Sequence, residues 1–105
     1  MSTRKEYMEE LDRLVDRVRS MSLVRLAAEL PPCASRADAV RALTSDVAAQ
    51  ALRSEGLPDR PVPVLGDESV GDQLAVVAHD LAVSCDDEVV LESFAKRFRE
   101  LRLAL

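Results

Sequence analysis

The sequence contains no isoleucine, tryptophan or asparagine, and its aromatic residues are one tyrosine and two phenylalanines. Nucleobases and flat cofactors are usually held by stacking on aromatic rings, so this chain has little surface for that kind of recognition. It also has no apolar run near the roughly 18 residues that a membrane-spanning helix needs. These shortages argue against nucleotide binding by stacking, and we expect no membrane span.

Basic residues are the scarcer charge, with 14 lysines and arginines against 19 aspartates and glutamates, which gives a net charge of -5. The imbalance is local, because residues 57–88 contain one basic and eight acidic side chains. Such a segment repels a phosphate backbone and suits a basic partner surface. The charge pattern therefore argues against nucleic acid as a partner.

Cysteine is also scarce, with only Cys33 and Cys85, which lie far apart in the sequence. The first residues run directly into a charged amphipathic segment, without the apolar stretch of a secretory signal. We therefore expect a cytoplasmic protein with two free thiols, since disulfides are rare in a reducing compartment. The spacing of these cysteines and the single histidine matches no zinc motif, so we expect no metal and no other cofactor.

What the sequence does contain is aliphatic: 48% of the 105 residues are hydrophobic, mostly leucine, alanine and valine. A chain of this size can bury roughly two thirds of its unfolded surface, which allows one core but no two-domain enzyme with a cleft between domains. We therefore expect a single helical domain over residues 1–105, without enzymatic activity.

The clearest helical pattern lies near the N-terminus, where apolar residues recur at spacings of three and four: Tyr7, Leu11, Leu14, Val18 and Met21. Apolar residues continue to Leu30, so we expect either one long helix over residues 3–30 or a break near Ser20. We favour the continuous helix, with its second half more deeply buried. Pro31 and Pro32 end it, because neither residue donates a backbone hydrogen bond.

Three more helices follow from the capping residues and the apolar spacing. Ser35 is placed to accept a hydrogen bond from the backbone of Asp38 and so to start a second helix, which ends at Gly56. The helical period returns from residue 67 or 69 to about residue 86. Asp86 or Asp87 can then cap a fourth helix that runs to the last residue.

The connection over residues 57–66 contains three prolines and cannot be helical. Its valines and leucines would reduce solubility if they were exposed, so we expect an extended strap laid across the bundle. The expected fold is all-α: a four-helix bundle or compact four-helix array with this Pro-rich extended connection between the second and third helices.

His79 is the only histidine, so any histidine-dependent chemistry would use it. The run Ala78-His79-Asp80-Leu81 resembles the phospho-acceptor motif of histidine phosphotransfer domains, in which an exposed histidine on a four-helix bundle is followed two residues later by leucine. The resemblance covers four residues, and it ends at Ala82, where that family usually has Lys-Gly after the leucine. It implies a signalling domain with His79 as phospho-acceptor, which we keep as the alternative function.

Hydrophobic surface is the remaining functional signal. The N-terminal stripe can pack within one chain or between two chains. The C-terminal residues stay apolar to the end, where fraying normally favours polar side chains. The candidate interface residues are Tyr7, Leu11, Leu14, Val18, Leu101, Leu103 and Leu105. We therefore expect a small non-enzymatic protein-interaction or regulatory module that binds a protein partner or itself, as a homodimer.

Overall fold

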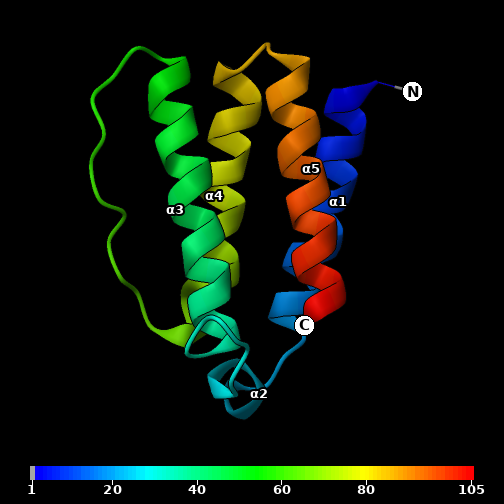
Figure 1. The fold of residues 1–105 in the computed structure, drawn as a ribbon, viewed down its shortest axis with the longest axis vertical. Coiled ribbons are helices and arrows are strands. Elements are labelled where there is room, and N and C mark those ends of the chain that lie inside the picture. The colour runs from blue at the N-terminus through cyan, green and yellow to red at the C-terminus, as the bar shows by residue number, and fades with distance from the viewer. Residues whose placement is uncertain (1) are drawn as a thin grey trace.

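Five α-helices make up most of residues 2–105, which are the residues that this computed structural model describes (Figure 1). The helices are α1 (Thr3–Arg19), α2 (Leu23–Ala27), α3 (Arg36–Ser54), α4 (Val70–Ser84) and α5 (Glu88–Ala104), and a short 3-10 helix, η1 (Asp67–Ser69), precedes α4. No strand occurs in the described residues. The predicted all-α class with four substantial helices is confirmed.

The four long helices do not simply alternate in direction. Helices α1 and α5 run from the upper to the lower end of Figure 1, whereas α3 and α4 both run upward. Helix α2 lies across the lower end, and a short turn after Ser84 joins α4 to α5. Helices α3 and α4 are therefore parallel neighbours, and the connection between them must return along their whole length.

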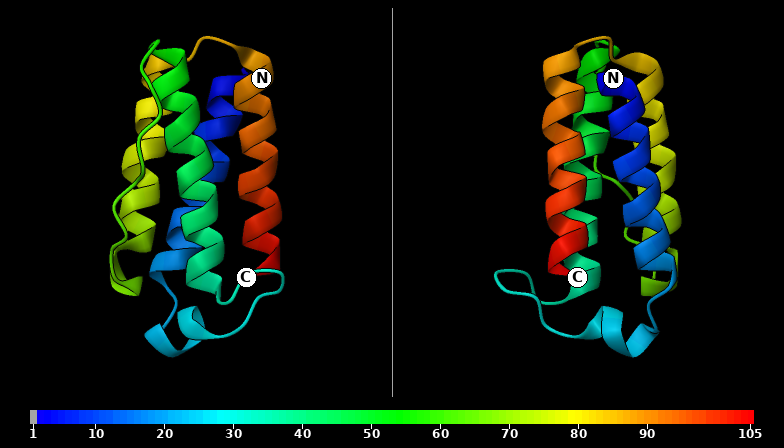
Figure 2. Two further views of the ribbon diagram at one scale, coloured as in Figure 1. Left: turned by 60° about the vertical axis from the view of Figure 1, so that its left-hand side comes forward. Right: turned by 90° about the vertical axis from the view of Figure 1, so that its right-hand side faces the viewer.

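That return connection is residues 57–66, which we call the strap. Helix α3 has 19 residues, which corresponds to a length of about 28 Å. A fully extended segment of about ten residues reaches about 33 Å. The strap must therefore be extended to span this distance, and its three prolines favour such a backbone. Both views of Figure 2 place it on the side of α3 and α4 that faces away from α1 and α5.

All four long helices contribute to one core, and its largest side chains meet between α1, α4 and α5. Tyr7 and Phe98 are completely buried, and their rings pack edge to face with centroids 5.2 Å apart. The Tyr7 hydroxyl donates a hydrogen bond of 2.6 Å to the backbone carbonyl of Ala78 in α4. This contact joins all three helices, and burial raises the pKa of Tyr7 above its ordinary range.

The predicted continuity of the first helix is wrong, because α1 ends at Arg19 and α2 begins at Leu23. Two serines provide the break. The Ser20 hydroxyl donates to the carbonyl of Arg17 at 2.7 Å, and the Ser22 hydroxyl accepts from the N–H of Arg25 at 3.2 Å. Serine side chains that bond to nearby backbone groups compete with helix continuation.

The second half of this segment is also less buried than expected. In α2 only Leu26 is buried, while Leu23 is 57% and Val24 is 82% exposed. The segment lies across the lower end of the bundle instead of entering the core. A helix of five residues that lies on the end of the bundle can bury only the face that contacts the bundle, and its other face stays in solvent.

Three predicted helix ends are confirmed. Ser35 caps α3 by accepting from the N–H of Asp38 at 3.0 Å. Gly56 follows α3 with a positive φ of 71°, a conformation that L side chains rarely adopt. Asp87 is the N-cap of α5 and accepts from the N–H of Val89 at 2.9 Å.

The strap is extended as predicted, but the bundle does not cover its apolar side chains. Val64 is 85% exposed, Leu65 is 44% exposed, and only Val62 is partly buried. The expectation that the strap lies flat on the helices is therefore wrong. It stands away from them and leaves a cavity beneath it.

Candidate functional site

The cavity beneath the strap has a volume of about 540 Å³, and we call it the strap groove. Its floor is formed by α3 and α4 and its outer wall by the strap. The aliphatic lining residues are Ala48, Ala51 and Leu52 of α3, Val76 and Val77 of α4, and Pro61, Val62, Pro63 and Leu65 of the strap. Ligand pockets in proteins usually have volumes of about 300–1,000 Å³ and mostly apolar linings, so the strap groove has the size and chemistry of a binding site.

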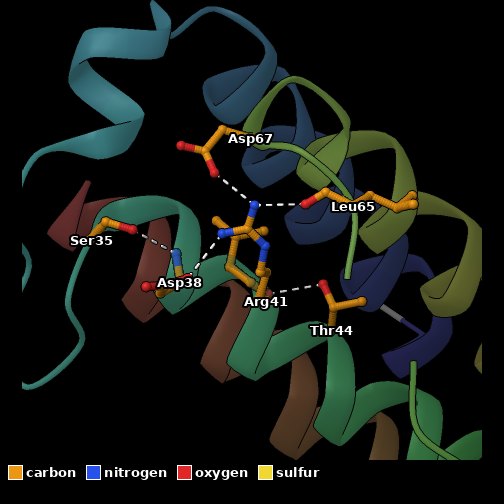
Figure 3. Close-up of polar contacts among 7 residues, drawn as sticks. Ser35, Asp38, Arg41, Thr44, Leu65 and Asp67 are labelled. Carbon is orange, nitrogen blue, oxygen red and sulfur yellow. Dashed lines mark hydrogen bonds and ion pairs between the residues drawn. The ribbon is translucent and has the colours of Figure 1, made fainter. Parts of the chain in front are cut away.

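The lower end of the strap is fixed by Arg41 of α3 (Figure 3). Its guanidinium donates to the Leu65 carbonyl at 2.8 Å and to the Asp67 carboxylate at 2.6 Å. A third hydrogen bond, of 2.9 Å, reaches Asp38 in the first turn of α3. The bond to Asp67, reinforced by the one to Asp38, raises the pKa of Arg41 above its ordinary value. Arg41 therefore ties the start of α4 to the start of α3.

A second bond holds the middle of the strap, where the Gln73 side chain donates to the Pro63 carbonyl at 2.8 Å. Among the described residues, no hydrogen bond joins residues 58–62 to the helices. The strap is thus anchored along its lower half, and at its upper end the Leu57 N–H donates to the Leu52 carbonyl at 2.9 Å.

The charged residues on the groove lining are mostly acidic. They are Glu55, Asp72 and Asp80, with Arg60 of the strap as the one base on the lining. Asp72 is paired with Arg19 at 2.7 Å, whereas no ion pair within the described chain engages Glu55 or Asp80. The groove therefore combines an aliphatic floor with two unneutralised carboxylates at its rim.

His79 lies outside the strap groove. It is exposed and borders a separate cavity of about 360 Å³ between α1 and α4. Asp12 and Asp16 of α1 line the same cavity, together with Arg19. A phosphoryl group on His79 would lie near these two carboxylates, and like charges repel. No hydrogen bond within residues 2–105 orients the imidazole ring. Asp72, which lies two turns before His79 on α4, is bound to Arg19 instead.

Most of the candidate interface residues are used by the core of the single chain. Tyr7, Leu11, Leu14 and Val18 are buried in it. Leu101 packs against the core while partly exposed, and Leu105 is 8% exposed. Only Leu103, at 68% exposed, is free on the surface. The structure therefore brings the predicted residues together as a packing face and leaves one of them for an external contact.

The two thiols are free, as expected, and Cys85 is buried while Cys33 is half-buried. Within residues 2–105, no group of three or more histidine, cysteine or acidic side chains is arranged to hold a metal ion. No helix in this part of the chain is long and apolar enough to cross a membrane.

Comparison with known proteins gives no relative: no protein-family model, no curated protein and no solved structure matches this chain.

The sequence analysis did not find the strap groove. Val76 lies off the apolar stripe of its helix, and the strap valines were expected to be covered. One signal was available, because residues 57–88 are both acidic and rich in exposed aliphatic side chains. A segment of that kind is typical of a surface that awaits a partner.

Proposed function

We propose that this protein is a non-enzymatic interaction module that binds an apolar segment of a partner protein in the strap groove. The single observation that carries the proposal is the groove itself, an aliphatic cavity of about 540 Å³ on the outside of the bundle. The largest patches of exposed apolar surface on small proteins are often binding sites.

Val76 supports this assignment most directly. It lines the groove and is 62% exposed, although the same helix buries Leu74, Ala78 and Leu81 completely. The chain thus has enough aliphatic residues on α4 for its core, and Val76 faces solvent in addition to them. Covering Val76 and Leu52 with partner side chains would remove apolar surface from water, which favours association.

The proposal includes an expected location and an expected alternative partner. A cytoplasmic location is supported by the two unpaired thiols, since cysteines in oxidising compartments are usually bridged. A homodimer remains the alternative to a different partner, and Leu103 is the candidate residue that a second copy would offer.

The test uses Nile red, a neutral fluorophore that brightens in apolar surroundings, with the purified full chain. The two variants are Val76→Asp and Val83→Asp, which add the same charge to exposed positions of the same helix. Only Val76 lines the groove. Burying an unpaired carboxylate beside the dye is unfavourable, so Val76→Asp should weaken binding by at least about tenfold, or about 1.4 kcal/mol.

Val83→Asp should bind the dye like the unmodified protein. Circular dichroism checks that both variants stay folded, as expected for exposed positions. Failure of the unmodified protein to bind Nile red, or equal binding by both variants, would overturn the proposed function.

A further inference from the structure

We infer that the partner segment is a basic amphipathic helix, with aliphatic side chains for the groove and lysines or arginines gathered at one end. The inference rests on the proposed function and names the partner chemistry of the same site. It follows from the direction of α3 and α4, the charges at the rim and the length of the groove.

The parallel arrangement of α3 and α4 makes the upper end of the groove negative. Each helix carries a partial negative charge at its C-terminus, and both C-termini lie at the upper end (Figure 1). In an antiparallel pair the two ends would offset each other. The backbone of this pair instead adds two partial charges of the same sign at one end of the site.

Side chains increase the same charge. Glu55 is the C-cap of α3, where a carboxylate meets the negative end of its own helix. Asp80 lies one turn before the end of α4 and lines the groove beside it. Both side chains are exposed and outside the ion pairs of the described chain. A partner cation placed here would relieve an unfavourable interaction in addition to gaining new ones.

At the opposite end of the groove both carboxylates are held in ion pairs. Asp38 and Asp67 lie near the N-termini of α3 and of η1, where acidic residues are favourable, and Arg41 bridges them at 2.9 and 2.6 Å. The lining carboxylates without an ion-pair partner are therefore at the upper end, where Arg60 of the strap, the one base on the lining, makes no ion pair with them. A matching segment needs its bases at the corresponding end.

The dimensions of the floor suit a short helix. On α4 the lining runs from Asp72 to Asp80, a rise of about 12 Å that corresponds to about two helical turns. On α3 it runs from Ala48 to Glu55, a rise of about 10 Å. Two packed helices with an apolar furrow between them are a common receptor for an amphipathic helix.

A second copy of this chain fits the site less well. Its exposed helical segment with aliphatic and basic side chains is α2, where Leu23 and Val24 are 57% and 82% exposed beside the exposed Arg25. That helix has five residues, a length of about 8 Å, which is shorter than the floor of the groove. The end of α5 offers only Leu103, because Phe94 and Phe98 are buried in the core, so a different protein is the better occupant.

The experiment uses two helical peptides of leucine and alanine, one with a cluster of lysines at one end and a twin with glutamates in their place. Their dissociation constants are measured by fluorescence anisotropy against the full chain. Asp80→Asn and Glu55→Gln remove the two rim charges. Glu92→Gln is the matched control, since Glu92 is exposed on α5 and does not line the groove.

We expect the lysine peptide to bind more tightly than its twin. Each rim variant should reduce that preference by up to about fivefold, the size of an exposed ion pair, while Glu92→Gln leaves it unchanged. The preference should also decrease with added salt, which screens exposed charges. Nile red binding should be the same in all three variants.

Two results would overturn the inference. In the first, the twin peptides bind equally, or the preference for the lysine peptide is the same in the rim variants as in the unmodified protein. If Nile red still distinguishes Val76→Asp, the groove then binds apolar segments without selecting their charge. In the second, the molar mass from light scattering doubles with concentration and Val76→Asp abolishes the doubling, which makes a second copy the occupant.

Discussion

The α1–α5 pair and the α3–α4 pair are built from helices of similar length, yet the first pair is closed and the second is open. Large side chains fill the first interface, among them Tyr7, Leu11 and Phe98. Helices α3 and α4 also bury large side chains in the core, among them Val40, Val47 and Leu74. They differ from α1 and α5 in a second, outer face, whose Ala48, Leu52 and Val76 form the floor of the strap groove.

Stability and the groove surface depend on different side chains in this molecule. The buried side chains of all four long helices form the core, while the exposed aliphatic residues of α4 and the strap contribute little to it. Substitutions on the two sides should therefore have very different effects on the free energy of unfolding.

The largest expected effect is on the closed side. Phe98→Ala removes a completely buried ring that packs against Tyr7, and such truncations cost about 3–5 kcal/mol. Urea unfolding followed by circular dichroism measures the loss. Val64→Ala in the strap is the control, since Val64 is 85% exposed. Equal losses in the two variants would contradict the separation of core and binding surface.

A smaller effect concerns the pH dependence of the same core. Burial raises the pKa of Tyr7, so the folded chain keeps a proton that the unfolded chain releases above the ordinary tyrosine pKa of about 10. The stability from neutral Tyr7 is complete below that pH and is lost as the pH rises towards the folded-state pKa. Stability should therefore fall on the alkaline side.

Tyr7→Phe tests this assignment. It removes the hydrogen bond to the Ala78 carbonyl, which costs about 1 kcal/mol at neutral pH. It should also make the alkaline decrease in stability shallower, as measured by urea unfolding across a pH series. Because Tyr7 is the only tyrosine, tyrosinate absorbance reports its ionisation directly. A pKa in the ordinary range would contradict its burial.

The smallest effect is expected on the open side. Arg41→Gln removes the bonds that fix the lower end of the strap, with a stability loss of about 1 kcal/mol or less. The backbone NMR order parameters of Val64, Leu65 and Gly66 should decrease, and Arg41→Lys should restore part of the order. Arg53→Gln is the matched control, because Arg53 lies on the same helix and bonds only to the Gln50 side chain. Unchanged order parameters in Arg41→Gln would show that the strap is held in another way.

Local patterns were sufficient for much of the fold. The helix ends at Ser35 and Gly56 were predicted correctly, and Asp87 is one of the two predicted caps of the last helix, because a cap depends on a few neighbouring residues. The break at Ser20 was missed, since an apolar pattern that continues through two serines does not reveal that each serine will bond to the nearby backbone. The buried N-terminal stripe was recognised, but its spacing alone could not distinguish a core from an interface.

By itself, the sequence determined the all-α class, the positions of four substantial helices, an extended Pro-rich connection and a concentration of acidic charge in residues 57–88. All of these depend on interactions between residues close in the chain. Only the tertiary structure decided that α3 and α4 run parallel, that the strap stands off from them and that Glu55 and Asp80 border the same groove. Helix direction and the meeting of distant side chains are set by packing between segments, which neither residue spacing nor composition specifies.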